Sequence, residues 1–302
     1  MFVDGVVRVQ VPATSANLGP GFDSLGLALA RYDELEAEIL ADGLEVEVLG
    51  EGAGEVPTDE RHLVVRAMRA AFTAMDVQAP GLRLTCRNVI PHGRGLGSSS
   101  AAIVGGITLA RGLVADGEER LDREAALRLA ADLEGHPDNV APALLGGFVI
   151  AGGAPGGWYA VNAPVAAEVS AVVFVPSIPL HTEVARGLLP EVVPHADAAA
   201  NAGKAALLVA ALAGRPEWLH TATADLLHQE QRGPAMPDSL ALIHELRGDG
   251  VPAVVSGAGP SVLAFTDDSG AAALLRRCPD GWRAWHLSVD RVGCTLSRVL
   301  GS

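Results

Sequence analysis

The first third of the chain alternates apolar and polar residues with the period of a half-buried β-strand. Val7, Val9 and Val11 form one such run, and residues 44–48 and 82–86 repeat the pattern. Side chains on a strand point to opposite faces in turn, so each run presents one apolar face to a core. The pattern therefore predicts strands in these three places.

Apolar residues at helical spacing separate and follow these strands. The predicted helices cover residues 61–75, 98–114, 122–133, 182–189, 201–213, 217–228 and 239–247. Further strands are predicted at residues 148–151, 171–175, 251–255, 262–266 and 285–289. Strands and helices do not alternate regularly, so the pattern favours an α+β protein over a doubly wound sheet.

A loop that concentrates glycine and proline, residues 152–157, is the predicted boundary inside the chain. It divides the protein into an N-terminal domain, residues 1–155, and a C-terminal domain, residues 156–302. A chain of 302 residues is long enough to bury a sizeable core in two closely packed parts.

Composition and charge exclude several functional classes. The formal charge of −14 counts against a nucleic-acid partner, because phosphate backbones are bound by clustered Lys and Arg. A membrane partner is not expected either, since there is no basic run or long apolar helix. The N-terminus lacks the pattern of a signal peptide, and the three cysteines are far apart. These features predict a cytoplasmic protein.

The stretch Pro91–Ala102, PHGRGLGSSSAA, carries the most chemical information. Gly93, Gly95 and Gly97 let the backbone adopt positive φ angles and turn its N–H groups toward one point. A helix is predicted to start directly afterwards, and its unpaired N–H groups and dipole favour an anion such as phosphate. A tight connection between two elements is the alternative explanation of the same glycines.

Two common nucleotide-binding motifs do not match this loop. A P-loop requires a lysine after its last glycine, and none follows Gly97. A dinucleotide-binding fingerprint spaces its glycines as G-x-G-x-x-G, whereas here the third glycine comes one residue early. The loop therefore belongs to another class of phosphate site.

Two more loops have the composition of binding loops. Residues 12–23, PATSANLGPGFD, place small hydroxyl residues, Asn17 and Asp23 around two glycines after the first strand. Residues 256–261, SGAGPS, put Gly257 between two predicted strands, where a hairpin or a close approach to a ligand explains it.

In this order the three loops resemble the three motifs of the GHMP kinases. Residues 12–26 and 134–143 are also similar to the signatures of the homoserine kinase branch. The resemblance implies an N-terminal domain related to ribosomal protein S5 domain 2 and a ferredoxin-like C-terminal domain. It also implies that ATP phosphorylates the hydroxyl of L-homoserine to O-phospho-L-homoserine, a step toward threonine, with the homodimer as one expected state.

The resemblance implies which residues bind ATP and its metal ion. The residues expected to bind the triphosphate are Pro91, Gly93, Arg94, Gly95, Leu96, Gly97, Ser98, Ser99 and Ser100, and residues 62–65 are expected near adenine. Mg²⁺ takes few protein ligands in such sites, and Ser98 and Glu134 are the candidates. Glu134 stands only four residues before Asp138, closer than in some relatives, so a solvated glutamate at a helix end is the alternative.

The resemblance also implies which residues bind the phosphoryl acceptor, homoserine. The residues expected to bind homoserine are Asn17, Asp23, Asp138, Asn139, Arg186, Arg232 and Gly257. An amino acid needs a carboxylate for its ammonium group, here Asp23, and a guanidinium for its carboxylate, here Arg186 and Arg232.

Asp138 and Asn139 are the expected catalytic residues. Asp138 either accepts the hydroxyl proton as a general base or only orients the hydroxyl, and both remain open. His136 is expected to hydrogen-bond or pack beside it. Another kinase of the same family, acting on mevalonate or a sugar, is the alternative function, and a non-catalytic nucleotide-binding protein is a third.

Overall fold

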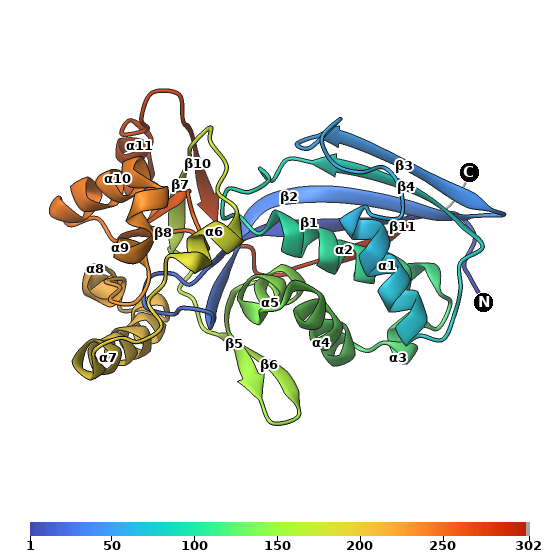
Figure 1. The fold of residues 1–302 in the computed structure, drawn as a ribbon, viewed down its shortest axis with the longest axis horizontal. Coiled ribbons are helices and arrows are strands. Elements are labelled where there is room, and N and C mark those ends of the chain that lie inside the picture. Colours follow the sequence, from blue (N-terminus) through green and yellow to red (C-terminus); the bar gives the residue numbers. More distant parts are fainter. Residues whose placement is uncertain (300–302) are drawn as a thin grey trace.

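In the computed structural model, which describes residues 1–299, the chain forms two units that each combine a β-sheet with helices (Figure 1). The first unit holds a seven-stranded sheet with the order β11-β1-β2-β4-β3, and β5 and β6 extend it from β2. Its strands are β1 (Val6–Ala16), β2 (Leu25–Leu40), β3 (Gly43–Gly50), β4 (Gly81–Asn88), β5 (Phe148–Ala154), β6 (Gly157–Ala163) and β11 (Thr295–Val299).

Helices cover one face of this sheet and enclose the larger core. They are α1 (Leu63–Ala74), α2 (Ser98–Leu113), α3 (Gly117–Arg120), α4 (Arg123–Glu134) and α5 (Pro137–Leu145). The helix α2 packs on β1 and β2, where side chains such as Val9, Leu35 and Ile107 are fully buried. On the other face, charged pairs such as Arg8–Glu36 meet solvent, which explains the strict alternation along these strands.

The second unit holds a four-stranded antiparallel sheet with the order β10-β7-β9-β8. Its strands are β7 (Ser170–Val175), β8 (Ala253–Val255), β9 (Val262–Thr266) and β10 (Arg283–Ser288). The fourth strand in chain order lies beside the first, as the expected ferredoxin-like arrangement requires. Helices α10 (Pro237–Gly248) and α11 (Asp268–Leu275) pack on it around a separate apolar core.

Four helices and a loop segment lie between β7 and α10 in the chain. They include α6 (Thr182–Gly187), α7 (His195–Leu212), α8 (Leu219–Ala222) and α9 (Gln229–Arg232), and short 3₁₀ turns at Pro216–Trp218 and Gly233–Ala235 extend them. In Figure 1, α6 lies where the two units meet. None of the helices within residues 1–299 is long and apolar enough to cross a membrane.

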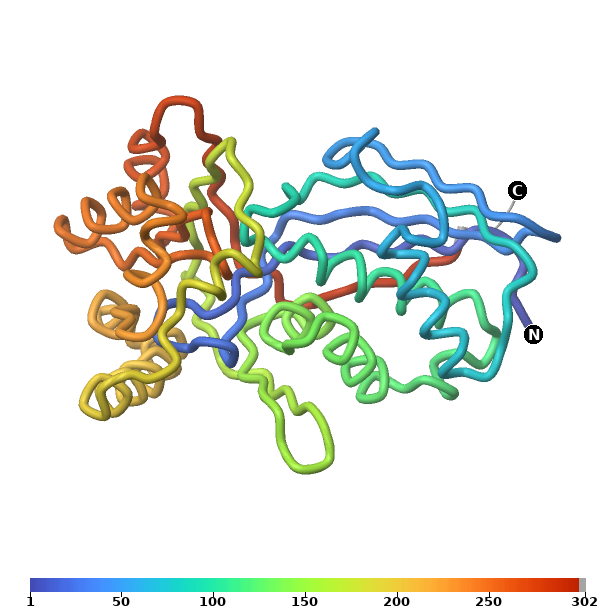
Figure 2. Tube along the Cα trace, in the orientation of Figure 1, coloured from blue at the N-terminus to red at the C-terminus, as the bar shows by residue number. Residues whose placement is uncertain are grey.

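The chain crosses between the two units more than once. Beyond residue 155, β6 continues the first sheet as a hairpin with β5, and β11 returns to pair with β1. Figure 2 shows the C-terminal strand running back beside the N-terminal strands. The loop 152–157 is therefore the tip of this hairpin, and the domain boundary at residue 155 stays a prediction.

One predicted helix is wrong in its second half. Residues 217–228 form a 3₁₀ turn and the short α8, which ends at Ala222. The carboxylate of Asp225 then accepts hydrogen bonds from the N–H groups of Leu227, His228 and Gln229. An aspartate that captures backbone N–H groups in this way replaces the helical hydrogen bonds and turns the chain.

Candidate active site

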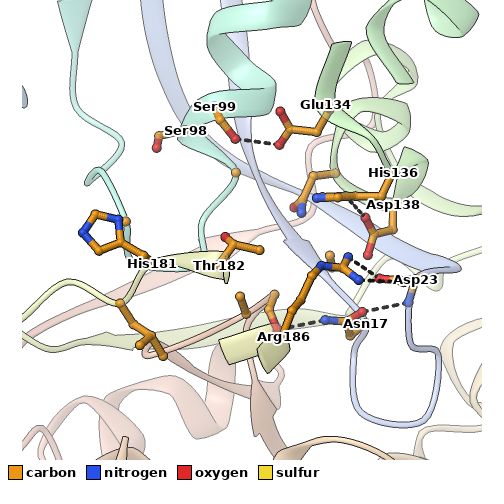
Figure 3. Close-up of a pocket in the computed structure, with 18 of the residues that line it drawn as sticks. Asn17, Asp23, Ser98, Ser99, Glu134, His136, Asp138, His181, Thr182 and Arg186 are labelled. Carbon is orange, nitrogen blue, oxygen red and sulfur yellow. Dashed lines mark hydrogen bonds and ion pairs between the residues drawn. The ribbon is translucent and has the colours of Figure 1, made fainter. Parts of the chain in front are cut away.

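The residues singled out in the sequence converge on one cavity of about 200 Å³ where the two units meet (Figure 3). Seven segments contribute: the loop after β1, the glycine-rich loop before α2, the end of α4, the start of α5, the region of α6, α9, and the loop between β8 and β9. The lining includes Asn17, Asp23, Gly93, Gly95, Gly97, Ser98, Ser99, Glu134, Asp138, Asn139, Arg186, Arg232 and Gly257.

The glycine-rich loop is held between the other two binding loops. Gly93, Gly95 and Gly97 all adopt positive φ angles, of 64°, 69° and 70°. A Cβ on Gly95 would lie 2.1 Å from the carbonyl oxygen of Ser256, and one on Gly97 would lie 1.9 Å from Thr14 Oγ1. The glycines are therefore required both for the turn and for the close contact between the three loops.

The loop delivers the start of α2 to the cavity. Gly97 is the N-cap of this helix, no side chain caps it, and its first turn contains no acidic residue. Its leading N–H groups and its dipole therefore form an anion site, to which the lining residues Ser98 and Ser99 add hydroxyl groups.

Four residues of the expected phosphate-binding set lie outside this lining. Pro91 and Leu96 are buried, and the Ser100 hydroxyl donates to Glu134. The guanidinium of Arg94 donates to the carbonyl oxygens of His92 and Ser177, so it joins the loop to the segment after β7. Contact of these four with a nucleotide stays a prediction.

Glu134 and the serines form the candidate metal site. Glu134 Oε1 accepts hydrogen bonds from Ser99 Oγ at 2.6 Å and from Ser100 Oγ at 2.9 Å. Within residues 1–299 there is no cluster of three His, Cys, Asp or Glu side chains that could hold a metal. One carboxylate beside hydroxyl groups at an anion site nevertheless fits Mg²⁺, which keeps several waters and takes few protein ligands.

At the other end of the cavity, Asp23 and Arg186 form a bidentate ion pair. Arg186 Nη1 lies 3.0 Å from Asp23 Oδ2, and Nη2 lies 2.7 Å from Oδ1. This hydrogen bonding raises the pKa of Arg186 above its usual value. Asn17 supports the pair by accepting a hydrogen bond from the Asp23 N–H and donating to the carbonyl of Gly257.

Arg232 is buried to an unusual degree for an arginine, with 1% of its surface exposed. Burial and the neighbouring charge of Arg186 lower the pKa of Arg232 to about 10. Its Nη1 donates to His228 Nδ1 and to the Gly257 carbonyl, whereas Nε has no partner within residues 1–299. A buried guanidinium with a donor left over fits a site for an anionic ligand group.

Asp138 lies at the start of α5 and is 2% exposed. One of its oxygens, Oδ1, lies 2.6 Å from His136 Nδ1. Burial opposes protonation of His136, but the hydrogen bond and the charge of Asp138 prevail and raise the pKa of the imidazole. Next to it, Asn139 Oδ1 accepts a hydrogen bond from Thr14 Oγ1 at 2.8 Å, which fixes the start of α5 on β1.

A second cavity of about 290 Å³ opens on the other side of the α2 N-terminus. It shares Ser98 and Ser99 with the first cavity, and its remaining lining is mainly apolar, with Leu63, Val64 and Ala101 among the contributors. His62 also lines it and is 6% exposed, and its Nδ1 has no hydrogen-bond partner among residues 1–299. The two cavities thus offer space for a planar apolar group on one side of the anion site and a charged one on the other.

Sequence reasoning missed several lining residues, namely Ala16, Leu180, His181, Thr182 and Ala258. Leu180, His181 and Thr182 directly precede α6, and the Leu180 N–H donates to the carbonyl of Gly93. Their place just before Arg186 in the chain was the available signal. Ala16 and Ala258 have no side-chain chemistry that a sequence pattern could have marked.

Comparisons with known proteins assign the chain to a family. Residues 62–147 match the family model of the GHMP kinases N terminal domain, and residues 207–284 match that of the GHMP kinases C terminal. The homoserine kinase of Streptomyces avermitilis is 54% identical over 295 residues, which cover 98% of this chain and 97% of that protein. The chain belongs to the homoserine kinases, a branch of the GHMP kinase family.

Other homoserine kinases support the assignment. The enzyme of Clavibacter michiganensis is 52% identical, with 97% of this chain and 94% of the relative covered. The crystal structure of homoserine kinase from Cytophaga hutchinsonii superposes with a TM-score of 0.88 at 25% identity, covering 98% of this chain and 99% of that one. Mevalonate kinase of L. major shares the fold, with a TM-score of 0.69 at 16% identity over 97% and 98% of the two chains.

Proposed function

We propose that the protein transfers the γ-phosphoryl group of ATP to the side-chain hydroxyl of L-homoserine, giving ADP and O-phospho-L-homoserine. One observation carries the choice of acceptor. A carboxylate, Asp23, and two guanidiniums, Arg186 and Arg232, line the same cavity as the anion site at α2. This arrangement offers counter-charges to both ends of an amino-acid zwitterion.

ATP, the phosphoryl donor, would span both cavities. Its base and ribose fit the cavity that His62 and Val64 line, and its phosphates fit the loop Gly93–Gly97 and the start of α2. Ser98 and Glu134 would hold Mg²⁺, which supplies charge neutralisation on the phosphate oxygens when it is bound. No lysine of the P-loop type is required, because backbone N–H groups and the helix dipole bind the phosphates.

The acceptor would enter by exchanging partners within the charged pair. Without substrate, Asp23 and Arg186 neutralise each other. The ammonium group of homoserine would pair with Asp23. Its carboxylate would bind Arg186 and the donors of Arg232 that have no partner among residues 1–299. Asp23 and Arg186 each keep a counter-charge throughout, and Arg232, whose partners in the structure are neutral, gains one, so binding does not leave an unpaired ion in the cavity.

Asp138 would act on the hydroxyl. One oxygen is engaged by His136, which leaves the other to accept a hydrogen bond from the homoserine hydroxyl. The hydroxyl oxygen forms the new bond to the γ-phosphorus while the bond to the β–γ bridging oxygen breaks, and the hydroxyl proton passes to Asp138 or to solvent. We propose that Asp138 chiefly orients the hydroxyl, since a loose transition state needs little deprotonation beforehand.

Mevalonate and a sugar are the alternative phosphoryl acceptors. The carboxylate of mevalonate would suit the arginines, but mevalonate has no ammonium group for Asp23. A neutral sugar would leave Arg232 without a counter-charge and would offer no charge to replace either partner of the Asp23–Arg186 pair. The need to desolvate these charged groups without compensation disfavours both alternatives. A cytoplasmic location and a homodimeric state are part of the same proposal and rest on the family resemblance.

The test is a panel of acceptors with Mg·ATP. L-homoserine, mevalonate and galactose are each incubated with purified protein, ADP release is followed, and the product is identified by ³¹P NMR. We expect a phosphomonoester on the homoserine hydroxyl only. Turnover of another acceptor in place of homoserine would refute the substrate, and ATP binding without any turnover would favour a nucleotide-binding protein.

A further inference from the structure

His228 is a fully buried histidine that lies behind the cavity and does not line it. It is the N-cap residue of α9, the helix that ends with Arg232. Its ring contacts two of the three parts that would hold the acceptor: the loop after β1, through Gly19, and Arg232. It has no direct role in the phosphoryl transfer proposed for the cavity.

The partners of the two ring nitrogens determine its protonation. Nε2 lies 2.8 Å from the carbonyl oxygen of Gly19, which can only accept, so Nε2 must carry the hydrogen. Nδ1 lies 3.1 Å from Arg232 Nη1, which can only donate, so Nδ1 must present a lone pair. His228 is therefore the neutral tautomer with its hydrogen on Nε2, and a doubly protonated ring would turn an N–H toward the guanidinium.

The charges around the ring agree with the neutral form. Burial lowers the pKa of His228, and the nearby charge of Arg232 lowers it further. Two carboxylates oppose these effects: Asp225, whose Oδ1 lies 3.6 Å from Nε2, and Asp23 on the loop after β1. Neither carboxylate hydrogen-bonds the ring, so they do not displace the Gly19 carbonyl as the partner of Nε2.

The backbone of His228 and the Gly19 carbonyl that its ring contacts are both held in place. The backbone N–H of His228 donates to Asp225 Oδ2 at 2.9 Å, which fixes the residue at its end of α9. Gly19 has a φ of 84°, and a Cβ there would lie 2.4 Å from the carbonyl oxygen of Thr223, so its carbonyl is held in place as well. The ring of Phe22 packs beside His228 at 5.2 Å and lies under the guanidinium of Arg232, also at 5.2 Å.

These contacts decide which edge of Arg232 is free. Nη1 has two hydrogens, and it donates to His228 Nδ1 and to the Gly257 carbonyl, so it is fully used. Nε has no partner in the described part of the chain. The planar guanidinium therefore has Nη1 fixed, and its unused donors lie on the Nε–Nη2 edge, where Nε itself is buried; this is an edge that binds a carboxylate in a bidentate manner.

We propose that His228 is a positioning residue that selects the Nε–Nη2 edge of Arg232 for the carboxylate of the acceptor. It acts through the lone pair on Nδ1, while its Nε2–H joins the same arginine to the loop that carries Asp23. This inference rests on the proposed function, because it takes an amino acid to be the acceptor.

Three variants separate the two hydrogen bonds. His228→Asn keeps an acceptor near the place of Nδ1, His228→Gln keeps a donor near the place of Nε2, and His228→Phe keeps the ring volume without either. His244→Asn, on the exposed side of α10, is the matched control. Each protein is assayed with L-homoserine and with 3-aminopropan-1-ol, which is homoserine without its carboxylate.

For His228→Phe we expect kcat/KM for homoserine to fall roughly 10- to 100-fold, as for the loss of an ordered hydrogen bond to a charged group. The loss should be in the KM for homoserine, with the KM for ATP nearly unchanged. The activity with 3-aminopropan-1-ol should change little, so the preference for the carboxylate collapses. His228→Asn should recover most of the loss, and His228→Gln should not.

Equal losses with both acceptors, or recovery by Gln and not by Asn, would overturn the proposal. If His228→Phe does not fold, the comparison of Asn with Gln decides alone, because both variants retain a polar group. Wild-type protein that phosphorylates homoserine while His228→Phe keeps the full preference would refute only the role of His228. Wild-type protein that does not phosphorylate homoserine would refute the proposed function itself.

Discussion

Asp138 illustrates how a single carboxylate is shared between the protein and an expected substrate. Its Oδ1 is bound to His136, and its backbone carbonyl is in close contact with β2, where a Cβ on Gly26 would lie 2.0 Å from it. The side chain therefore has little freedom to move. A carboxylate that is fixed in this way is suited to orienting a hydroxyl at low entropic cost.

Replacing Asp138 tests this role. We expect Asp138→Ala to lower kcat by roughly 100-fold or more, the usual scale for a group that positions or accepts a proton, with the KM for ATP nearly unchanged. Asp138→Asn should retain more activity than Asp138→Ala if orientation is the main role, since the amide oxygen can still accept. Equal activity of Asp138→Asn and Asp138→Ala would favour the general-base role.

Asp33 predicts a pH dependence of stability. Burial raises the pKa of Asp33 to about 6 from 3.8, although the N–H groups of Ile90 and Val89 act in the opposite direction. The folded state therefore holds this proton more tightly than the unfolded chain does. The folded protein is favoured while the carboxyl is protonated, and this advantage is lost as the pH rises from about 4 through 6.

We expect Asp33→Asn to remove the loss of stability with rising pH, because the amide stays neutral and its oxygen can still accept hydrogen bonds from the N–H groups of Val89 and Ile90. Relative to wild type, the unfolding free energy of the variant should improve between pH 4 and pH 7, by up to about 3 kcal/mol. Urea unfolding at several pH values measures it, with Asp42→Asn as the exposed control. Parallel profiles of Asp33→Asn and wild type would contradict the assignment.

At the scale of elements, strands and helices with a clear period were predictable, and the others were not. The helix predicted at 98–114 is α2, and the strand predicted at 171–175 is β7. The long β2 was missed, because residues 35–40 are rich in Leu, Ala and Glu, which favour helices. It is a strand because it pairs with β1, β4 and β5, a set of contacts that no local pattern records.

Among the other elements that were missed, two have similar physical reasons. The helix α5 contains Pro142, which argues against a helix in a sequence pattern, yet it begins with Pro137, a favoured residue at the first helical position, and packs on the sheet. The strand β11 is far from its partner β1 in the chain. The site itself was largely predictable, because its motifs are short and local, whereas the bonds of His228 depend on the assembled fold.

The glycine-rich loop gives a prediction at this scale. Gly97→Ala should disturb all three binding loops, since its Cβ would collide with Thr14 Oγ1, the atom that donates to Asn139. Gly54→Ala is the control, because Gly54 also has a positive φ, of 77°, but has open space around its Cβ. The free energy of unfolding of this control should fall by roughly 1 kcal/mol, from backbone strain alone.

We expect Gly97→Ala to lose clearly more stability than Gly54→Ala in thermal unfolding, and to raise the KM for ATP in steady-state kinetics. If the two variants were equally destabilised and both bound ATP normally, the loop would be only a tight connection, and the anion site would have to be sought elsewhere.

At the scale of the whole molecule, the acceptor groups come from both units. Asp23 belongs to the loop after β1, whereas Arg186 and Arg232 lie in the part of the chain that follows β7. A ligand that contacts all three therefore joins the units and binds only the folded protein. Ligands of this kind raise the free energy of unfolding by an amount set by their concentration and affinity.

We expect L-homoserine at about 100 times its dissociation constant to stabilise the wild-type protein by about 2.7 kcal/mol. Arg232→Ala should lose this response while keeping the response to ATP, because the proposed phosphate site lies at the other end of the cavity. Thermal unfolding with each ligand measures both. A homoserine response that survives in Arg232→Ala would show that the acceptor carboxylate binds elsewhere.

The central claim is that a zwitterion is recognised by opposite charges at one end of the cavity and phosphorylated at the other. The most direct test is kcat/KM for L-homoserine and for mevalonate, measured on the same protein with saturating Mg·ATP. We predict a preference for homoserine of roughly 100-fold or more, since mevalonate has no ammonium group to pair with the half-buried carboxylate of Asp23. Equal values, or a preference for mevalonate, would contradict this account of the site.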